Sequence, residues 1–279
     1  MIYITGATGR LGQEVIRLFP NAHLVKRGDQ LDFHDADAVI HLAGSLNFHD
    51  PKEMRESNVE LTRRVVAATP KTARLIFASS ISVYGKKLAE IPANENTPCH
   101  PDSDYAKSKY EAERIALQHS NSVALRMGVI YGPGEKFGEF FTFLRRIERG
   151  RIFIIGNGKN RIPFVHVQDV ACAIEAALNA PPGVYVLSGE SVEQEKAYRM
   201  AAEALGVKPP SGHVPFWVAQ LFGFVGLIPA EHLSILYYDR VFDRSKAKKY
   251  LGFKPRSFAD GLKEIVAAYQ KQKVARAEE

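Results

Sequence analysis

The sequence predicts an α/β protein built around a doubly wound parallel sheet. Short apolar runs alternate with helical patterns over the first half of the chain, which is the order of repeated βαβ units. Two of the runs, 38–42 and 75–78, are dominated by apolar residues, as in strands that are covered on both faces. A glycine-rich segment, residues 6–12, joins the first run to the first helical pattern. Together these features predict a Rossmann-type fold.

The elements of this core follow in order along the chain. Strands are expected at Ile2–Thr5, His23–Lys26, Ala38–Ala43, Arg74–Ala78 and Val123–Arg126. Helices are expected near Arg10–Leu18, Pro51–Ala68 and Tyr105–His119. Because the second and third strands are so close in the sequence, the helix that normally joins them is predicted to be missing or reduced to a turn.

A second lobe is predicted to start after Gly128, where the segment YGPG and a Phe-rich stretch follow. We expect residues 1–130 to form the core and residues 131–279 to form mostly a smaller, mainly helical lobe that binds the substrate. Residues 164–188 are expected to return to the core, through a strand at Phe164–Val167, a helix at Asp169–Asn179 and a strand at Val184–Leu187.

Composition and charge exclude several classes of protein. The chain has 279 residues, 46% hydrophobic and 24% charged, which is ordinary for a globular protein. No window reaches the roughly 18 consecutive apolar residues of a membrane span. The nearest, Pro215–Pro229, contains Gln220 and leaves a lid, a core helix and a membrane-surface contact open. The net charge of +6 is scattered and lacks interleaved aromatic residues, so no nucleic-acid partner is expected.

Compartment and partners follow from the chain's start and its cysteines. The sequence begins directly with a strand, so no signal peptide is expected. Cys99 and Cys172 have no metal-like spacing, which favours the reducing cytoplasm and no metal site. We expect a small-molecule substrate and no stable membrane insertion, and a homodimer is left open.

The segment from residue 6 to residue 12 predicts a dinucleotide-binding loop. It lies between a strand and a helix, where one glycine permits a tight turn, one permits close approach of a pyrophosphate and one permits helix–strand packing. Backbone N–H groups at the helix start would bind the phosphates. The expected cofactor contacts in this loop are Gly6, Thr8, Gly9, Arg10, Leu11 and Gly12.

Motifs along the whole chain resemble those of the extended short-chain dehydrogenase/reductases, which include sugar-nucleotide epimerases. They are TGATGRLG at 5–12, HLAG at 41–44, ASSISVYG at 78–85, YAKSK at 105–109, GVIYGPG at 128–134 and FVHVQDVACAI at 164–174. The resemblance implies a nicotinamide cofactor contacted by Leu42, Ala43, Gly44 and Asn58. Leu61 stands where the family has a glycine, so the resemblance does not extend to the close backbone approach that this glycine allows.

Tyr105 and Lys109 carry the predicted chemistry. Four residues apart on a helix, their side chains share one face. A free tyrosine has a pKa of about 10, and a neighbouring lysine cation stabilises its phenolate. The phenol can then exchange a proton with a substrate oxygen while hydride moves to or from nicotinamide. Both residues are also expected to contact the cofactor.

Ser80 completes the expected catalytic set. It ends a strand about two dozen residues upstream, where doubly wound sheets bind ligands. By resemblance it matches the family's catalytic Ser or Thr. Family members that eliminate water place an Asp-Glu pair directly after that residue, whereas this chain has Ile81-Ser82. Elimination therefore lacks its carboxylates, and reduction, oxidation and epimerisation remain.

The expected substrate contacts extend into the second lobe. Arg126 and Arg161 resemble arginines that face the substrate in this family. Tyr131, Phe137, Phe140 and Phe141 are expected either to line the substrate cleft or to belong to the core. The expected substrate-binding residues are Ser80, Ser82, Arg126, Tyr131 and Arg161.

The end of the second strand bears on the choice of cofactor. An acid there commonly binds a ribose 2′-hydroxyl, whereas arginine accommodates a 2′-phosphate. Lys26 and Arg27 occupy this position, so NADP is expected over NAD, although Asp29 nearby keeps NAD open. Asp32 and Phe33 resemble the family's adenine-side element, and the short junction predicts an adenine pocket that is more open than usual.

Three functions compete. The main prediction is an NADP-dependent oxidoreductase acting on a small or lipophilic carbonyl or alcohol. The alternative is a sugar-nucleotide epimerase or reductase of the same superfamily. A third possibility, from another class, is a non-catalytic NADP-binding sensor or assembly protein, and the presence of Ser80, Tyr105 and Lys109 argues against it. The substrate, the direction of the reaction and the oligomeric state do not follow from the sequence.

Overall fold

The structure, a computed structural model, describes residues 1–133, 139–224, 233 and 235–277. The chain divides into two compact units. Unit 1 comprises Met1–Gly128, Val167–Ser188 and Phe242–Lys254, and unit 2 comprises Val129–His166, Gly189–Val241 and Pro255–Glu279.

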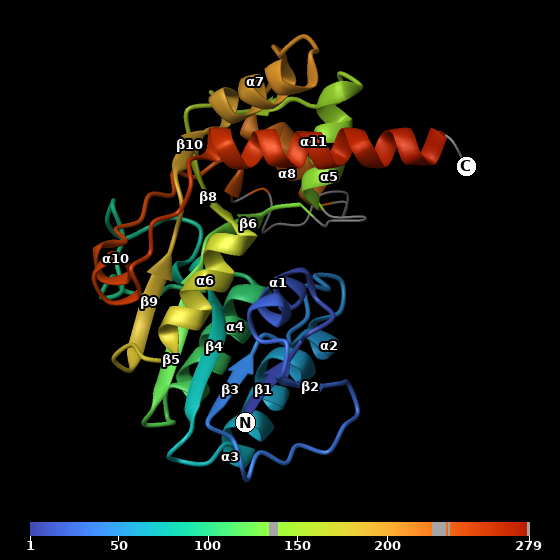
Figure 1. Ribbon diagram of the computed structural model, residues 1–279. Coiled ribbons are helices and arrows are strands. Elements are labelled where there is room, and N and C mark those ends of the chain that lie inside the picture. The colour runs from blue at the N-terminus through green and yellow to red at the C-terminus, as the bar shows by residue number, and fades with distance from the viewer. Residues whose placement is uncertain (134–138, 225–232, 234, 278–279) are drawn as a thin grey trace. The chain divides into compact units, whose positions relative to one another are not determined.

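A six-stranded parallel sheet forms the centre of unit 1 (Figure 1). In spatial order its strands are β2 (His23–Val25), β1 (Ile2–Thr5), β3 (Ala38–His41), β4 (Arg74–Ser80), β5 (Ser122–Met127) and β9 (Gly183–Leu187). β2 and β3 lie on opposite sides of β1, so the strand order reverses at the carboxyl ends of β1 and β3. Doubly wound sheets bind their ligands at such a switch point. The predicted fold class is confirmed.

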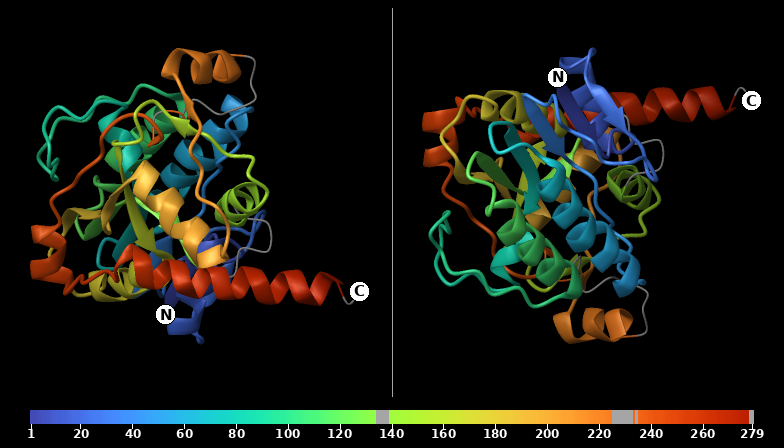
Figure 2. Two further views of the ribbon diagram at one scale, coloured as in Figure 1. Left: turned by 90° about the horizontal axis from the view of Figure 1, so that it is seen from above. Right: turned by 90° about the horizontal axis from the view of Figure 1, so that it is seen from below.

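Helices cover both faces of this sheet, which explains why β3, β4 and β5 are almost fully buried. α1 (Arg10–Leu18) packs against α6 (Val167–Ala177) on one face. α3 (Leu61–Ala68) packs against α4 (Asp104–Ala116) on the other (Figures 1 and 2). α10 (Ser245–Leu251) packs beside β9, so a C-terminal segment also belongs to unit 1.

Two segments of unit 1 can be compared directly with the helices that the sequence predicts. Residues 26–37, all of which the structure describes, form turns and extended chain without a helix, as predicted. The helix expected over 51–68 is interrupted. α2 (Pro51–Arg55) passes into a π-helical turn, η1 (Glu56–Glu60), before α3 begins. Such turns are rare and often mark functional sites.

Unit 2 is built on a three-stranded sheet in the order β10-β8-β6. These strands are β6 (Val129–Tyr131), β8 (Arg161–His166) and β10 (Ser191–Glu193). The strand expected at Phe164–Val167 is therefore present, but β8 pairs with β6 and β10 instead of returning to the large sheet. The return to unit 1 begins at Val167, with α6.

Helices and a second small sheet complete unit 2. The helices are α5 (Glu139–Glu148), α7 (Gln194–Leu205), α8 (Phe216–Phe224) and α11 (Phe258–Ala277), and β7 (Ile154–Ile155) pairs with β11 (His213–Val214). An aromatic core joins α5, α11 and the sheet, with Phe164 stacked on Phe258 at a centroid distance of 4.4 Å.

Of the apolar stretch 215–229, the structure describes residues 215–224. In α8, Trp217 and Leu221 are 65% and 57% exposed, while Phe216 stacks on Tyr237. Residues 225–229, like Phe137, lie outside the described residues. Within the described part of the chain, no helix has the length and apolar character needed to cross a membrane.

Candidate active site

The loop that follows β1 has the backbone geometry the glycine pattern predicts. Gly6 has a φ of +72°, and a Cβ there would lie 2.5 Å from the backbone nitrogen of Ala43. At Gly12 a Cβ would lie 2.3 Å from the carbonyl oxygen of Gly6. Only glycine fits either position, because the loop packs against the end of β3 and against the first turn of α1. The end of β1 and the end of β3 thus form one surface.

The start of α1 fits the diphosphate of a dinucleotide. Gly9 is its N-cap, and α1, which the structure describes in full, has no side-chain cap and no acid in its first turn. In contrast, Asp50 caps α2 and Ser103 caps α4 with side-chain oxygens. The free backbone N–H groups and the positive dipole end of such a helix start are the features that favour binding of an anion. Thr8 and Gly9 are exposed there, and Leu11 is half-buried.

The basic end of β2 is accessible. Lys26 and Arg27 are exposed directly after the strand. Asp29 folds back on its own turn, where its carboxylate accepts a hydrogen bond of 2.8 Å from the backbone N–H of Lys26. The acid that could compete for a ribose hydroxyl is therefore engaged in holding this turn.

On the adenine side, Asp32 and Phe33 differ in their environment. Asp32 is exposed and lies 2.9 Å from Nδ1 of His34, and this hydrogen bond lowers the pKa of Asp32. The side chain of Phe33 is buried against Tyr3, at a centroid distance of 5.0 Å. Phe33 thus belongs to the core, and only its backbone remains for a contact with a base.

Lys109 and Tyr105 lie one turn apart near the start of α4. The Lys109 ammonium is buried, donates a hydrogen bond to the carbonyl oxygen of Ala78 in β4, and lies 4.5 Å from the centroid of the Phe77 ring. Burial lowers the pKa of Lys109 to about 8, against an opposing effect of Glu113. Tyr105 is half-buried, and its ring meets that of Phe48 edge-on at 5.6 Å.

Ser80 is the last residue of β4, two positions after the carbonyl that holds Lys109. Its Oγ accepts a hydrogen bond of 3.1 Å from the backbone N–H of Ser82 and so caps the 3-10 turn η2 (Ile81–Tyr84). Ser80 is half-buried, whereas Ser82 is buried. Ser80 and the Lys109 ammonium thus lie near the end of β4, and Tyr105 lies one helical turn before Lys109 on α4, all within unit 1.

Asn58 has a different environment from the one expected of a cofactor contact. It is buried in the π-turn η1, and its Nδ2 donates to Oγ of Ser108 at 3.0 Å and to the carbonyl of Ser45 at 3.3 Å. Its Oδ1 accepts from the backbone N–H of Ser45 at 2.8 Å. Asn58 thus ties the loop after β3 to α4. No motif in the sequence indicates a role for Ser45 or Ser108.

Arg126 is a structural residue, which corrects its expected place in the substrate site. It is 5% exposed and pairs with the buried Glu113 on α4 at 2.7 Å. It also donates to the hydroxyl of Tyr84 at 2.8 Å and to a backbone carbonyl. Glu113 accepts a further bond from Ser79 at 2.5 Å. The guanidinium is committed to these partners, which come from α4, from η2 and from the backbone of Glu95.

In unit 2, the two expected substrate contacts also have protein partners. Tyr131 is 1% exposed and packs against Phe140 and Phe258, which places it in the aromatic core and corrects its expected position in a cleft. Arg161 is partly exposed at the start of β8 and forms an ion pair with Asp239. Its guanidinium Nε donates to that carboxylate at 2.9 Å.

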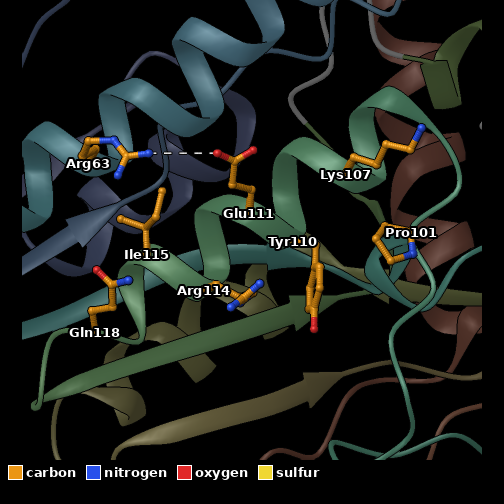
Figure 3. Close-up of a pocket in the computed structure, with 8 residues that line it drawn as sticks. All are labelled: Arg63, Pro101, Lys107, Tyr110, Glu111, Arg114, Ile115 and Gln118. Carbon is orange, nitrogen blue, oxygen red and sulfur yellow. Dashed lines mark ion pairs between the residues drawn. The ribbon is translucent and has the colours of Figure 1, made fainter.

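A hollow of about 470 Å³ lies on the outward side of α4 (Figure 3). Its lining residues are Arg63, Pro101, Lys107, Tyr110, Glu111, Arg114, Ile115 and Gln118. Lys107, Tyr110 and Glu111 lie on the side of the helix opposite to the buried Ser108 and Lys109. The hollow is therefore separate from the candidate active site. Among the described residues, no cluster of His, Cys, Asp or Glu could hold a metal ion.

The fold and the site together define a dinucleotide-binding α/β protein in which a buried lysine lies one helical turn from a half-buried tyrosine. The sequence model of the NAD dependent epimerase/dehydratase family matches residues 27–188, more than half of the chain. The chain belongs to this family, which confirms the resemblance to extended short-chain dehydrogenase/reductases and identifies a nicotinamide dinucleotide as the type of cofactor.

Two curated relatives and one solved structure illustrate the similarity. N-acetyl-α-D-glucosaminyl-diphospho-ditrans,octacis-undecaprenol 4-epimerase of Escherichia coli O157:H7 is 30% identical over 180 residues, covering 60% of this chain and 54% of the relative. 3β-hydroxysteroid-dehydrogenase/decarboxylase isoform 1 of Arabidopsis thaliana is 26% identical over 280 residues, covering 85% and 63%. The crystal structure of gox2253 has a TM-score of 0.80 at 25% identity, covering 98% of both chains. The chain thus spans between about half and two thirds of the length of these two curated relatives.

Proposed function

We propose that this chain is an NADP-dependent epimerase that inverts a hydroxyl-bearing carbon of a diphosphate-linked sugar. The observation that carries the proposal is the buried Lys109 ammonium, held at the end of β4 one helical turn from Tyr105. The chain's family and its similarity to an epimerase of a lipid-linked sugar diphosphate support this over the simpler carbonyl reductase that the sequence favours.

The chain's own residues would transfer the proton of the sugar hydroxyl. The Lys109 cation favours the phenolate of Tyr105, which takes the proton of the sugar hydroxyl as the C–H hydride leaves. Ser80 accepts from the N–H of Ser82, so its own hydroxyl hydrogen can bond the same sugar oxygen. The bound nicotinamide supplies a hydride acceptor that later returns the hydride. Tyr105 would then give the proton back to the sugar oxygen, and hydride returned to the opposite face of that carbon would leave the inverted alcohol.

Elimination of water is not part of the proposal. The positions after Ser80 that would need an acid and a base hold Ile81 and Ser82, and both are buried. Neither side chain is a carboxylate, so the reaction is confined to transfer of hydride and of the hydroxyl proton.

NADP is proposed over NAD from the charges at the end of β2. Lys26 and Arg27 are exposed where a 2′-phosphate would lie, and guanidinium groups bind phosphate through paired hydrogen bonds. The carboxylate of Asp29 already accepts a backbone hydrogen bond in its own turn. The open adenine side, with no helix over residues 26–37, is part of the same proposal.

A second candidate is net oxidation or reduction of a lipophilic alcohol or ketone. The exposed Trp217 and Leu221 on α8 favour an apolar ligand, and the steroid dehydrogenase relative is consistent with it. The two candidates share the Tyr–Lys chemistry and differ in whether the cofactor is consumed.

Product analysis and cofactor absorbance together test the proposal. The purified chain is incubated with UDP-N-acetylglucosamine and catalytic NADP⁺ or NAD⁺, and separately with a hydroxysteroid. Epimerisation inverts the sugar while the concentration of reduced nicotinamide stays constant. Stoichiometric formation of reduced cofactor would instead establish a dehydrogenase. If neither substrate reacts and Tyr105→Phe retains full biological activity, the chain is a non-catalytic NADP-binding protein and the proposal is wrong.

A further inference from the structure

A buried chain of hydrogen bonds connects the end of β3 with the π-turn before α3. The backbone N–H of Ala43 lies 3.3 Å from Oγ1 of Thr5, and that hydroxyl lies 2.6 Å from Nδ1 of His41. On the other side of the ring, Nε2 of His41 lies 2.9 Å from Oγ1 of Thr62. Thr62 in turn donates to the carbonyl oxygen of Asn58 at 2.6 Å.

The chemistry of the two end groups determines the position of every hydrogen in this series of hydrogen bonds. The Asn58 carbonyl can only accept, so the single hydroxyl hydrogen of Thr62 is directed at it. Thr62 must then accept from His41, which places the ring proton on Nε2. Nδ1 consequently accepts the hydroxyl hydrogen of Thr5, and Thr5 accepts from Ala43. All four hydrogen bonds point the same way, an arrangement in which each bond polarises the next.

Burial keeps the ring of His41 neutral. Thr5, His41 and Thr62 are 2%, 1% and 0% exposed. Desolvation lowers the pKa of His41 to about 3, and the nearby cation of Lys109 on α4 acts in the same direction. Within the part of the chain that the structure describes, the ring forms hydrogen bonds with the two hydroxyls, from β1 and α3, and lies 5.8 Å from the Phe77 ring of β4. A protonated ring would turn a second N–H toward Thr5, and the Thr5 hydroxyl hydrogen would then lose its acceptor Nδ1.

The series of hydrogen bonds continues from Asn58 to α4. The Asn58 side chain bonds Ser45 in the loop after β3 and Ser108 on α4, directly before Lys109. One connected set of polar groups thus runs from Thr5, next to the loop of residues 6–12, to α4, which carries Tyr105 and Lys109.

We propose that His41 is a positioning residue. Its neutral form, protonated on Nε2, holds the cofactor loop (residues 42–44) and the π-turn η1 in one fixed arrangement. The proposal rests on the proposed function in one respect, because it places the dinucleotide on the loop formed by residues 42–44. It assigns His41 no contact with the cofactor and no proton transfer.

Nitrogen NMR of histidine-labelled protein tests the tautomer directly. We expect the two ring nitrogens of His41, assigned by their loss in His41→Phe, to show a neutral ring protonated on Nε2 throughout the neutral pH range. Saturating NADPH is expected to shift them, since Ala43 would change its environment. A ring protonated on Nδ1, or one that titrates near the ordinary pKa of about 6.5, overturns the proposal.

The same spectra separate failure of this inference from failure of the proposed function. If nicotinamide fluorescence shows that NADPH binds while the His41 resonances stay unchanged, His41 does not position the cofactor loop. If NADPH does not bind at all, the cofactor assignment fails, and the tautomer measurement still decides whether the hydrogen-bond chain exists.

A matched pair of variants tests the consequence for binding. His41→Phe is expected to raise the Kd for NADPH about tenfold, because it breaks two buried hydrogen bonds and releases the loop. His41→Gln, whose amide has both an acceptor and a donor, is expected to restore part of the affinity. The control is His119→Phe, which removes another buried ring bonded to the carbonyl of Pro70. Equal Kd values for His41→Phe and His119→Phe, with equal losses of stability, would show that His41 is merely a core residue.

Discussion

At the scale of single residues, Lys109 has the environment that matters most for the proposed chemistry. An ammonium group removed from water loses solvation, and a carbonyl oxygen, an aromatic face and the more distant Glu113 only partly replace it. Its pKa therefore falls toward the working range of the enzyme. The same cation, one turn from Tyr105, is what would make a phenol act as a base near neutral pH.

The first prediction concerns the pH dependence of catalysis. Lys109 is cationic below a pKa of about 8 and neutral above it, so kcat/KM is expected to fall as pH rises through this value. The pKa is depressed relative to the unfolded chain, which binds the proton up to its ordinary value of 10.5, so the free energy of unfolding should rise with pH between these values. Lys109→Arg, which keeps a permanent charge, should lose the alkaline fall. A wild-type profile that stays flat well above pH 8 contradicts the assignment.

The second prediction concerns Tyr105. Tyr105→Phe removes the phenolic proton donor and acceptor while leaving the ring on Phe48, and turnover should fall by about 10²–10⁴-fold. The midpoint of thermal unfolding and the Kd for NADPH should stay near their wild-type values. Tyr110→Phe, on the outward side of the same helix, is the control and should retain full turnover. Comparable losses in both variants would point to damage to α4 rather than to lost chemistry.

At the scale of elements, α4 is joined to the sheet by a buried ion pair. Glu113 on α4 receives Arg126 from β5 and the Ser79 hydroxyl from β4, one turn beyond Lys109. Desolvation opposes the charge on Arg126, and the bonds from Glu113 and Tyr84 more than compensate, so the pKa of Arg126 is raised. This pair fixes the rotation of α4 and hence the faces on which Tyr105 and Lys109 lie.

The third prediction tests this pair by urea unfolding. Glu113→Gln should cost about 3–5 kcal/mol of unfolding free energy, because Arg126 is left buried without its counter-charge. Arg126→Met in the same background should recover part of that loss, since the uncompensated charge is then removed. If the two single losses simply add in the double variant, the residues are not coupled in the way their 2.7 Å contact requires.

At the scale of the whole molecule, bound cofactor is expected to stabilise the native chain. A ligand that binds only the native state adds about 2.7 kcal/mol at one hundred times its Kd. This effect can be read as a shift in thermal unfolding without knowledge of the substrate.

The fourth prediction uses this effect to identify the cofactor. NADPH should raise the unfolding temperature more than NADH at equal concentration, because Lys26 and Arg27 are exposed at the proposed 2′-phosphate position. Arg27→Glu should remove the difference between the two cofactors, whereas Lys87→Glu, an exposed charge reversal elsewhere in unit 1, should keep it. An equal or larger shift with NADH in the wild-type chain rules out the preference for NADP.

The predictions from sequence succeeded where the determining physics is local. Glycines 6 and 12 are required by contacts within a few residues or with the adjacent strand, and the missing helix follows from the small number of residues between β2 and β3. The candidate site was only partly foreseen. Arg126 and Tyr131 were expected to face a ligand, and both are buried because their partners, Glu113 and Phe258, come from other elements of the fold, α4 and α11.

The sequence by itself determined the class of this protein. Alternating apolar runs specify a parallel sheet with helices on both faces, and short motifs specify a nucleotide loop and a Tyr–Lys pair, because backbone preference and hydrophobic period act over a few residues. Only the tertiary structure decided which polar groups are bonded to one another. The series of hydrogen bonds from Ala43 through His41 to Asn58, and the pairing of Asn58 with Ser108, arise where β1, β3, η1, α3 and α4 meet. Such contacts depend on strand order and helix rotation, which no local pattern of residues encodes.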